Sequence, residues 1–407
     1  MRKTGLARLG SRSWTLYFVS VAAVLVSAAF GELARSQTEP RTPAVESRGF
    51  LPITSFYSTP IPLPAGRPGE LIRSERFDDY QLPEGISAVR ILYHSRSANG
   101  GDVAASGVVL VPDEPPPTGG RPVIAWAHGF TGVARQCAPS LMRNLNQGPF
   151  LSMYVKLGYA VVAADYAGLG TDSRNASVDL QTNATDVLYS IAAARSAVPA
   201  LGNRWIVIGE STGGLAALGV AELEGEIRDP GYLGGIAVSA VADGKDVDAM
   251  VFEASSPGQV LALVYGVQTL YPTFEVKRVL TDKALSLYRE IENACAVTVP
   301  DSELTAGQLL RRDWKENGLV QEFLARNTIG RKPARGPLLI ISSGSDPVVR
   351  TGIMARMVAG MCRQRDVVLF HQYQNSDSAG LLGDSVRDQL TWIQARFAGR
   401  LATSNCH

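Results

Sequence analysis

The residues best suited to chemistry lie in the stretch RWIVIGESTGGLAAL (204–218). Gly209, Ser211 and Gly213 form a G-x-S-x-G pattern between an apolar, β-branched run and a helix-like run that begins with small residues. In a tight turn from strand to helix, glycines on both sides leave room for neighbouring backbone, and the serine hydroxyl is exposed at the start of the helix. The pattern alone is weak in a chain with 40 glycines, but its position between strand and helix indicates that Ser211 is a nucleophile.

Such a serine needs hydrogen-bond donors for the oxyanion that forms when it attacks a carbonyl carbon. The backbone N–H of Thr212, next after the serine, is one expected donor. The second should come from the loop AHGFTG (127–132), which follows an earlier apolar run. We assign this donor to the N–H of Phe130, with Thr131 as the alternative. His128, in the same loop, precedes the serine and is expected to have a structural role.

An acid should follow the serine in the chain and orient a base. Asp346 lies in a glycine-containing turn just beyond the apolar run PLLIISS (337–343), which suits that role. The same aspartate would also be acceptable as a plain turn residue before proline, and Asp243 is the alternative acid. The base is harder to find, because the chain has only four histidines: His94, His128, His371 and His407.

The elements that must position these residues alternate between strands and helices. Two alternating runs, 86–95 and 103–112, flank a turn with Asn99, Gly100 and Gly101 and predict an antiparallel hairpin. Continuous apolar runs, typical of buried parallel strands, follow at 122–128, 159–166, 204–209, 234–240, 337–343 and 366–373. Helical spacing occurs at 178–199, 212–226, 350–364 and 384–398. The pattern predicts an α/β fold with an eight-stranded, mostly parallel, doubly wound sheet.

A long segment interrupts this alternation. About ninety residues separate the strands predicted at 234–240 and 337–343, more than a plain crossover needs. We therefore predict a helical cap at 248–334, inserted into a core of residues 71–247 and 335–407. Residues 32–70 are rich in Pro, Ser, Thr and Gly and predict an extended lead-in.

The N-terminal segment predicts export. Basic residues precede the apolar run WTLYFVSVAAVLVSAAFG (14–31), as in a signal peptide. Residues 1–31 are therefore predicted to be a cleaved signal, and a membrane anchor at 14–31 is the alternative. In an exported protein the four cysteines are expected to form two disulfides, because an even number of cysteines in an oxidising compartment favours pairing. Their spacing matches no zinc pattern, so we expect no metal.

The charge balance argues against one class of partner. The chain has 39 basic and 38 acidic residues, and no run of like charge stands out. Proteins that bind nucleic acid usually carry a basic face. We therefore expect no nucleic acid partner.

Several of these stretches together resemble the secretory lipase family, capped α/β hydrolases similar to the fungal lipase A group. They include PVIAWAHGFTG (122–132), GYAVVAADYAGLG (158–170), IGESTGGLAAL (208–218) and SGSDPVV (343–349). The likeness extends over most of the chain from about residue 55. It implies an α/β-hydrolase fold, hydrolysis of acyl esters and no cofactor. It also implies disulfides that pair Cys137 with Cys295 and Cys362 with Cys406.

The stretch HQYQNSDSAG (371–380) departs from the family where the base is expected. The family pattern there resembles Y-x-G/N-x-x-H-x-G, and Ser378 stands in the position of the histidine. Three interpretations stay open. His371 serves as an unconventional base, or the site has lost its base and the protein is a weak or inactive hydrolase, or another group such as Asp377 or Glu210 assists and supports reduced activity.

The sequence thus predicts an exported serine hydrolase of the lipase or esterase type. It would hydrolyse carboxylic esters, lipid esters above all, through an acyl-enzyme on Ser211, with impaired activity if Ser378 marks a lost base. The alternative is a catalytically dead protein on the same scaffold that binds lipids or esters. We expect a small-molecule or lipid ester as substrate, transient contact with a lipid interface, and a secreted or periplasmic location.

Overall fold

The two alternating runs near residue 100 form the antiparallel hairpin that their pattern predicted. The computed structural model describes residues 49–240, 257–293, 295, 305–344, 351–377 and 380–406. In it, β2 (Ile86–Arg96) pairs with β3 (Asp102–Pro112) along their whole length. A further strand, β1 (Leu71–Arg76), pairs with the outer edge of β2. Its sequence, LIRSER, lacks a run of alternating apolar residues, which is why the pattern did not predict it.

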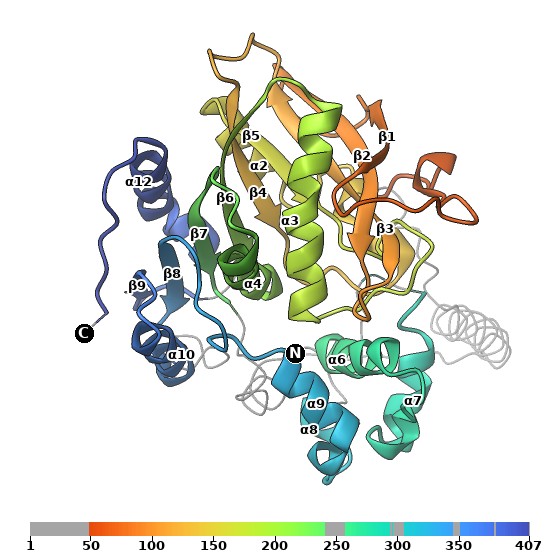
Figure 1. Cartoon of the computed structure of the whole chain (residues 1–407). Helices are drawn as coiled ribbons and strands as arrows, with labels where there is room; N and C mark the ends of the chain where they lie inside the picture. Colours follow the sequence, from red (N-terminus) through yellow and green to blue (C-terminus); the bar gives the residue numbers. More distant parts are fainter. Residues whose placement is uncertain are drawn as a thin grey trace, which may run out of the picture. The chain divides into compact units, whose positions relative to one another are not determined.

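The six continuous apolar runs form the parallel part of the sheet (Figure 1). These strands are β4 (Arg121–Ala127), β5 (Ala160–Ala164), β6 (Leu201–Glu210), β7 (Tyr232–Val238), β8 (Leu338–Ser343) and β9 (Val368–Tyr373). Within the described ranges the sheet has nine strands in the order β1-β2-β3-β5-β4-β6-β7-β8-β9. All eight predicted strands are therefore present, with β1 in addition, and the mostly parallel sheet is confirmed.

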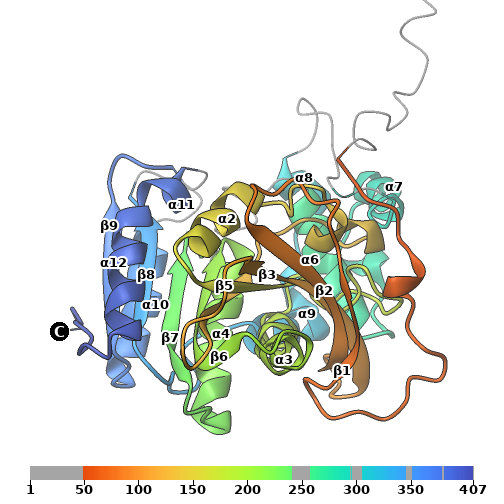
Figure 2. The same cartoon turned by 90° about the horizontal axis from the view of Figure 1, so that it is seen from above.

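Helices cover both faces of this sheet (Figures 1 and 2). One face packs against α3 (Leu180–Ala197), α4 (Thr212–Ile227) and α10 (Thr351–Arg363). The other packs against α2 (Gly148–Lys156), α11 (Leu381–Asp384) and α12 (Val386–Phe397). Ile206 and Val207, neighbours on β6, are both fully buried, one in each core. Because both faces are covered, the central strands are apolar throughout instead of alternating.

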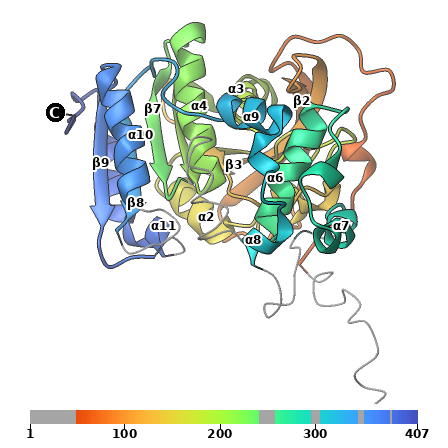
Figure 3. The same cartoon turned by 90° about the horizontal axis from the view of Figure 1, so that it is seen from below.

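Between β7 and β8 the described chain is helical (Figure 3). It contains α6 (Pro257–Leu270), η4 (Val276–Arg278), α7 (Asp282–Arg289), α8 (Ala306–Leu309), η5 (Trp314–Glu316) and α9 (Gly318–Arg326). We call α6 to α9 the helical insertion. Its side chains form a core of their own, in which Leu261, Leu309 and Phe323 are fully buried. Phe130 and Val133, from the loop after β4, pack against this core, so the insertion lies against the loop predicted to bind the oxyanion.

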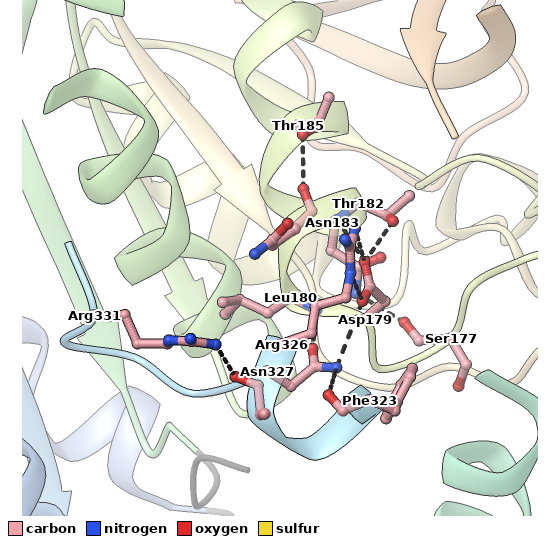
Figure 4. Close-up of polar contacts among 12 residues, drawn as sticks. Ser177, Asp179, Leu180, Thr182, Asn183, Thr185, Phe323, Arg326, Asn327 and Arg331 are labelled. Atoms are coloured by element: carbon pink, nitrogen blue, oxygen red, sulfur yellow. Dashed lines mark hydrogen bonds and ion pairs between the residues drawn. The ribbon is translucent and has the colours of Figure 1, made fainter. Parts of the chain in front are cut away.

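A buried polar cluster joins the end of the helical insertion to the start of α3 (Figure 4). Asp179 caps α3, because its Oδ1 accepts a hydrogen bond from the N–H of Thr182 at 2.9 Å. Arg326, the last residue of α9, donates from Nε to Asp179 Oδ2 at 2.8 Å. The next residue, Asn327, accepts the N–H of Leu180 on its Oδ1 at 2.5 Å. Asp179 is fully buried, so Arg326 supplies the positive charge that a buried carboxylate requires.

Both disulfides implied by the family resemblance are present. Cys137–Cys295 joins the turn η2 (Arg135–Cys137), which follows β4, to the helical insertion beyond α7. Cys362–Cys406 joins α10 to the C-terminal tail. In that tail, Asn405 hydrogen bonds along β9, with its N–H donating to Val368 O at 3.1 Å. The tail therefore covers part of the sheet edge that β9 would otherwise expose.

The predicted signal peptide, residues 1–31, and the alternative anchor at 14–31 lie outside the described residues. In the part of the chain that the structure describes, no helix combines the length and the apolar character needed to cross a membrane.

Candidate active site

Ser211 occupies the strained turn that the glycine spacing predicted. It lies between β6 and α4 with φ 56° and ψ −123°, a backbone conformation that L-residues rarely adopt. A Cβ on Gly209 would stand 1.9 Å from Gly213 O, and a Cβ on Gly213 would stand 2.0 Å from Ala127 O. Both positions therefore require glycine, because the elbow brings backbone against backbone.

The predicted oxyanion loop lies directly beside this serine. A Cβ on Gly129 would stand 3.3 Å from Ser211 Cβ, which makes Gly129 an immediate neighbour of Ser211. Thr212 is the first residue of α4, so its N–H has no acceptor within the helix. Thr131 Oγ1 is buried and has no hydrogen-bond partner among the described residues. The loop and the start of α4 thus both lie next to Ser211.

His128 fixes the orientation of the oxyanion loop. Its Nδ1 lies 2.6 Å from Gly129 O, and its Nε2 lies 3.2 Å from Asp165 O. Burial lowers the pKa of His128 to about 4, so the ring is neutral and donates once; we assign the proton to Nδ1, which makes the shorter contact. The carbonyl and the following N–H of a trans peptide point in opposite directions. With Gly129 O bound to the ring, the N–H of Phe130 is therefore directed away from His128.

Asp165 is a fully buried aspartate directly after β5 that no sequence pattern singled out. Its Oδ1 accepts the N–H of Ser140 at 2.8 Å, and its Oδ2 accepts the hydroxyl of Ser106 at 2.7 Å. Burial raises the pKa of Asp165, and the hydrogen bonds from Ser140 and Ser106 oppose that shift. An aspartate directly after the fully apolar strand β5, in AADYAGLG, was the available sequence signal.

Glu210, the residue before Ser211, carries a largely buried carboxyl group. A Cβ on Gly129 would stand 2.8 Å from Glu210 Oε2, so this carboxyl group contacts the oxyanion loop. Burial raises the pKa of Glu210 to about 7. At neutral pH the group is thus present in both its protonated and its ionised form.

The structure does not bring His371 to Ser211. Glu210, Val238, Ile341 and His371 stand in register on β6, β7, β8 and β9. Three strand spacings of about 4.8 Å place His371 roughly 14 Å from the strand that leads to Ser211. Its Nδ1 instead lies 2.8 Å from Asp388 Oδ2 on α12.

His94 and His407 are the two remaining histidines, and among the described residues neither of them lies at Ser211. His94 lies on β2, with Nδ1 3.0 Å from Asp102 Oδ2, and its ring packs against Gly66. His407 lies outside the described residues. Since both nitrogens of His128 face carbonyl oxygens, none of the three described histidines is placed to accept a proton from Ser211.

The predicted acid, Asp346, and the predicted base position, Ser378, lie outside the described residues, as does Asp243. The segments that lead to Asp346 and Ser378 are nevertheless neighbours. Ser343, at the end of β8, donates its hydroxyl to Ser376 O at 2.5 Å, and Gly344 N donates to Tyr373 O at 2.8 Å. The loops after β8 and β9 therefore start side by side. In the described ranges no group of three or more His, Cys, Asp or Glu side chains could hold a metal ion.

The sequence matches the secretory lipase family over residues 146–405, more than half of the chain. The chain belongs to this family. Candida antarctica lipase A in its closed state shares the fold with TM-score 0.74 and 18% sequence identity, over 87% of each chain. A rice cell wall degrading esterase from Xanthomonas oryzae gives TM-score 0.66 and 17% identity, over 81% of this chain and 98% of that one. A comparison with curated proteins found no significant match.

The structural neighbours confirm the α/β-hydrolase fold predicted from the sequence. Family membership places the chain among lipase-type hydrolases of carboxylic esters, which act on small-molecule or lipid esters. A secretory family and two disulfides indicate an extracellular protein.

Proposed function

We propose that this secretory lipase family member hydrolyses carboxylic esters through an acyl-enzyme on Ser211. The observation that carries the proposal is the elbow itself. Ser211 is held at positive φ between β6 and α4, and Gly129 of the oxyanion loop lies in contact with it. A serine that served only as a turn residue would not require this strain, which costs on the order of 1–3 kcal/mol.

The proposed reaction begins with attack of Ser211 Oγ on the ester carbonyl carbon. The N–H groups of Phe130 and Thr212 bind the oxyanion that forms, and the tetrahedral intermediate expels the alcohol. Water then hydrolyses the acyl-enzyme. Asp346 is the proposed acid and Ser378 the position where the family base is missing. Losing the histidine of a serine triad costs around 10⁶ in kcat, yet roughly 10³–10⁴ over the uncatalysed reaction remains from binding and the oxyanion hole.

We propose that the helical insertion is a cap over this site and that the substrate is a lipid ester. Its core packs on Phe130 and Val133, next to the oxyanion donors. An apolar cover at this place suits an acyl chain, because burying each CH₂ contributes about 0.8 kcal/mol to binding. The same property would give the protein transient contact with a lipid interface.

The second candidate function is binding of lipids or esters without catalysis. The observation that favours it is the position of the histidines. His371 is bound to Asp388, His94 to Asp102, and His128 to two carbonyl oxygens. If no other group takes the proton, Ser211 stays a weak nucleophile.

Labelling with a fluorophosphonate probe separates the two functions. An activated Ser211 should react with the probe, and Ser211→Ala should abolish both labelling and hydrolysis of p-nitrophenyl butyrate. Folded protein that neither labels at Ser211 nor hydrolyses the ester would overturn the enzymatic proposal. Folding is checked in parallel by circular dichroism, since the serine variant should unfold at a temperature no lower than the parent chain.

Export by residues 1–31 is part of the proposal. The two disulfides support it, because such bonds persist in oxidising compartments. N-terminal sequencing of the secreted protein should show that these residues are removed. Retention in the membrane fraction would favour the anchor at 14–31.

A further inference from the structure

The carboxyl group of Glu210 lies close to the nucleophile. A Cβ on Gly129 would stand 2.8 Å from Glu210 Oε2 and 3.3 Å from Ser211 Cβ. Glu210 Oε2 and Ser211 Cβ are thus no more than about 6 Å apart, which is close to the distance at which one water molecule bridges two polar groups. Gly129 lacks the side chain that would otherwise separate them.

No described residue satisfies or neutralises this carboxyl group. Its pKa is raised by burial, without any opposing hydrogen bond or cation. The first turns of α4 (TGGLAALG) carry no ionisable side chain, and the only one on β7 is Tyr232. The loop after β4 carries His128, which is neutral. The loop after β5 carries Asp165, whose carboxylate accepts from Ser106 and Ser140, and Tyr166, whose hydroxyl donates to His128 O at 2.8 Å.

We propose that Glu210 is the proton acceptor for Ser211, acting through one water molecule. The inference rests on the proposed ester hydrolysis and names the group that replaces the missing histidine. Asp377, the other carboxylate near the loop after β9, is exposed and accepts the N–H of Gly380 at 2.7 Å. It therefore serves as a turn residue, and Glu210 is the carboxylate that contacts the oxyanion loop.

Each step of the reaction balances with Glu210 in this role. The Ser211 hydroxyl loses its proton through the water to the Glu210 carboxylate while Oγ bonds to the carbonyl carbon. When the ester C–O bond breaks, the protonated Glu210 returns the proton to the departing alkoxide. A second water then attacks the acyl-enzyme and gives its proton to Glu210, which passes it to Ser211 Oγ as the carboxylic acid leaves.

The charge of the site also favours this arrangement. Proton transfer to Glu210 removes one negative charge at the moment when the oxyanion creates another beside Phe130 and Thr212. The buried site therefore holds a single negative charge before and during the attack. A carboxylate that stayed ionised would instead oppose the oxyanion across a medium of low dielectric constant.

The test is the pH dependence of p-nitrophenyl butyrate hydrolysis, measured from pH 5 to 9. The parent chain should show kcat/KM rising with an apparent pKa near that of Glu210, because the ionised form accepts the proton. Glu210→Gln should lower kcat/KM by roughly 10²–10⁴ and remove this rise. Glu210→Asp should keep the rise at a lower rate, and millimolar formate should restore part of the activity of Glu210→Ala.

Glu222→Gln is the matched control. Glu222 is also a carboxylate whose pKa burial raises, but its Oε1 accepts the N–H of Gly330 at 2.8 Å at the far end of α4. This variant should leave both the rate and the pH profile unchanged.

The outcomes separate the role of Glu210 from the proposed function. If the parent chain labels and hydrolyses at Ser211 while Glu210→Gln keeps its rate and profile, the role of Glu210 is overturned and the esterase proposal stands. If Glu210→Gln is slow but the parent profile shows no rise and formate rescues nothing, Glu210 is structural and the proposal is again overturned. A parent chain without labelling or hydrolysis overturns both.

Discussion

His371 Nδ1 lies 2.8 Å from Asp388 Oδ2, and the hydroxyl of Tyr373 donates to the same oxygen at 2.8 Å. Burial would raise the pKa of Asp388, but the hydrogen bonds from Tyr373 and His371 and the charge of Arg387 together hold it below its usual range. The histidine closest in sequence to the expected base position thus belongs to a structural pair between β9 and α12. This pairing supports the proposal that Ser378 marks the position of a lost base.

Ser378→His should restore that base. We expect kcat for p-nitrophenyl butyrate to rise at least about 100-fold, since a triad histidine can contribute up to around 10⁶. His371→Ala should leave kcat unchanged, because the ring is bound to Asp388. A collapse of activity in His371→Ala, with no gain in Ser378→His, would reverse these two assignments.

Glu210→Gln should stabilise the protein at alkaline pH. Below the ordinary pKa of 4.5 the carboxyl group is neutral in both states. Between that pH and about 7 the unfolded chain ionises while the folded chain stays protonated, so the free energy of unfolding falls as the pH rises. The full loss above this window is on the order of 3 kcal/mol.

Glutamine cannot ionise, so the variant should gain stability over the parent chain at pH 8 and none at pH 4. Urea unfolding at both pH values measures the difference. Glu226→Gln serves as the control, because Glu226 is an exposed residue of α4. An equal effect of Glu210→Gln at both pH values would contradict the assigned cause.

Arg326→Ala should be strongly destabilising. The substitution leaves the fully buried Asp179 carboxylate without its cation, which costs about 3–5 kcal/mol of unfolding free energy. The double variant Asp179→Asn with Arg326→Ala should lose less than the sum of the single changes. Arg331→Ala, which removes an exposed hydrogen bond to Ala325 O, should cost less than about 0.5 kcal/mol. Additive losses in denaturant unfolding would show that Asp179 and Arg326 are not coupled.

The two disulfides should differ in their contribution to stability. Cys137–Cys295 closes a sequence separation of 158 residues and Cys362–Cys406 one of 44. Replacing the first pair by serine should lower the free energy of unfolding by about 1 kcal/mol more than replacing the second. The reason is that a disulfide removes more entropy from the unfolded chain when it closes a longer loop. The first replacement should also slow ester hydrolysis, since a Cβ on Gly132, at the end of the oxyanion loop, would stand 2.7 Å from Cys137 Sγ. Equal costs in guanidinium unfolding would contradict the first expectation.

The strands and the tight turn at Ser211 could be predicted because both depend on patterns among residues that are close together in the chain. The elbow around Ser211 depends on residues that are neighbours in the chain, and the strands depend on continuous apolar runs. The pair Arg326–Asp179 spans 147 positions, and no periodicity encodes such a contact. The same holds for His371 and Asp388, since either residue alone is an ordinary polar position. The burial of Glu210 was equally hidden, because it depends on the loop that carries Gly129.

The helical insertion is held to the rest of the fold by the Cys137–Cys295 bond and by the Arg326–Asp179 pair. Arg174 adds hydrogen bonds to Tyr265 and Gln268 of α6. Phe130 and Val133 pack into the insertion core, while Gly129 of the same loop lies against Ser211. One short loop therefore belongs to two packed units, and a change in the packing of the insertion would be transmitted to the backbone beside Ser211.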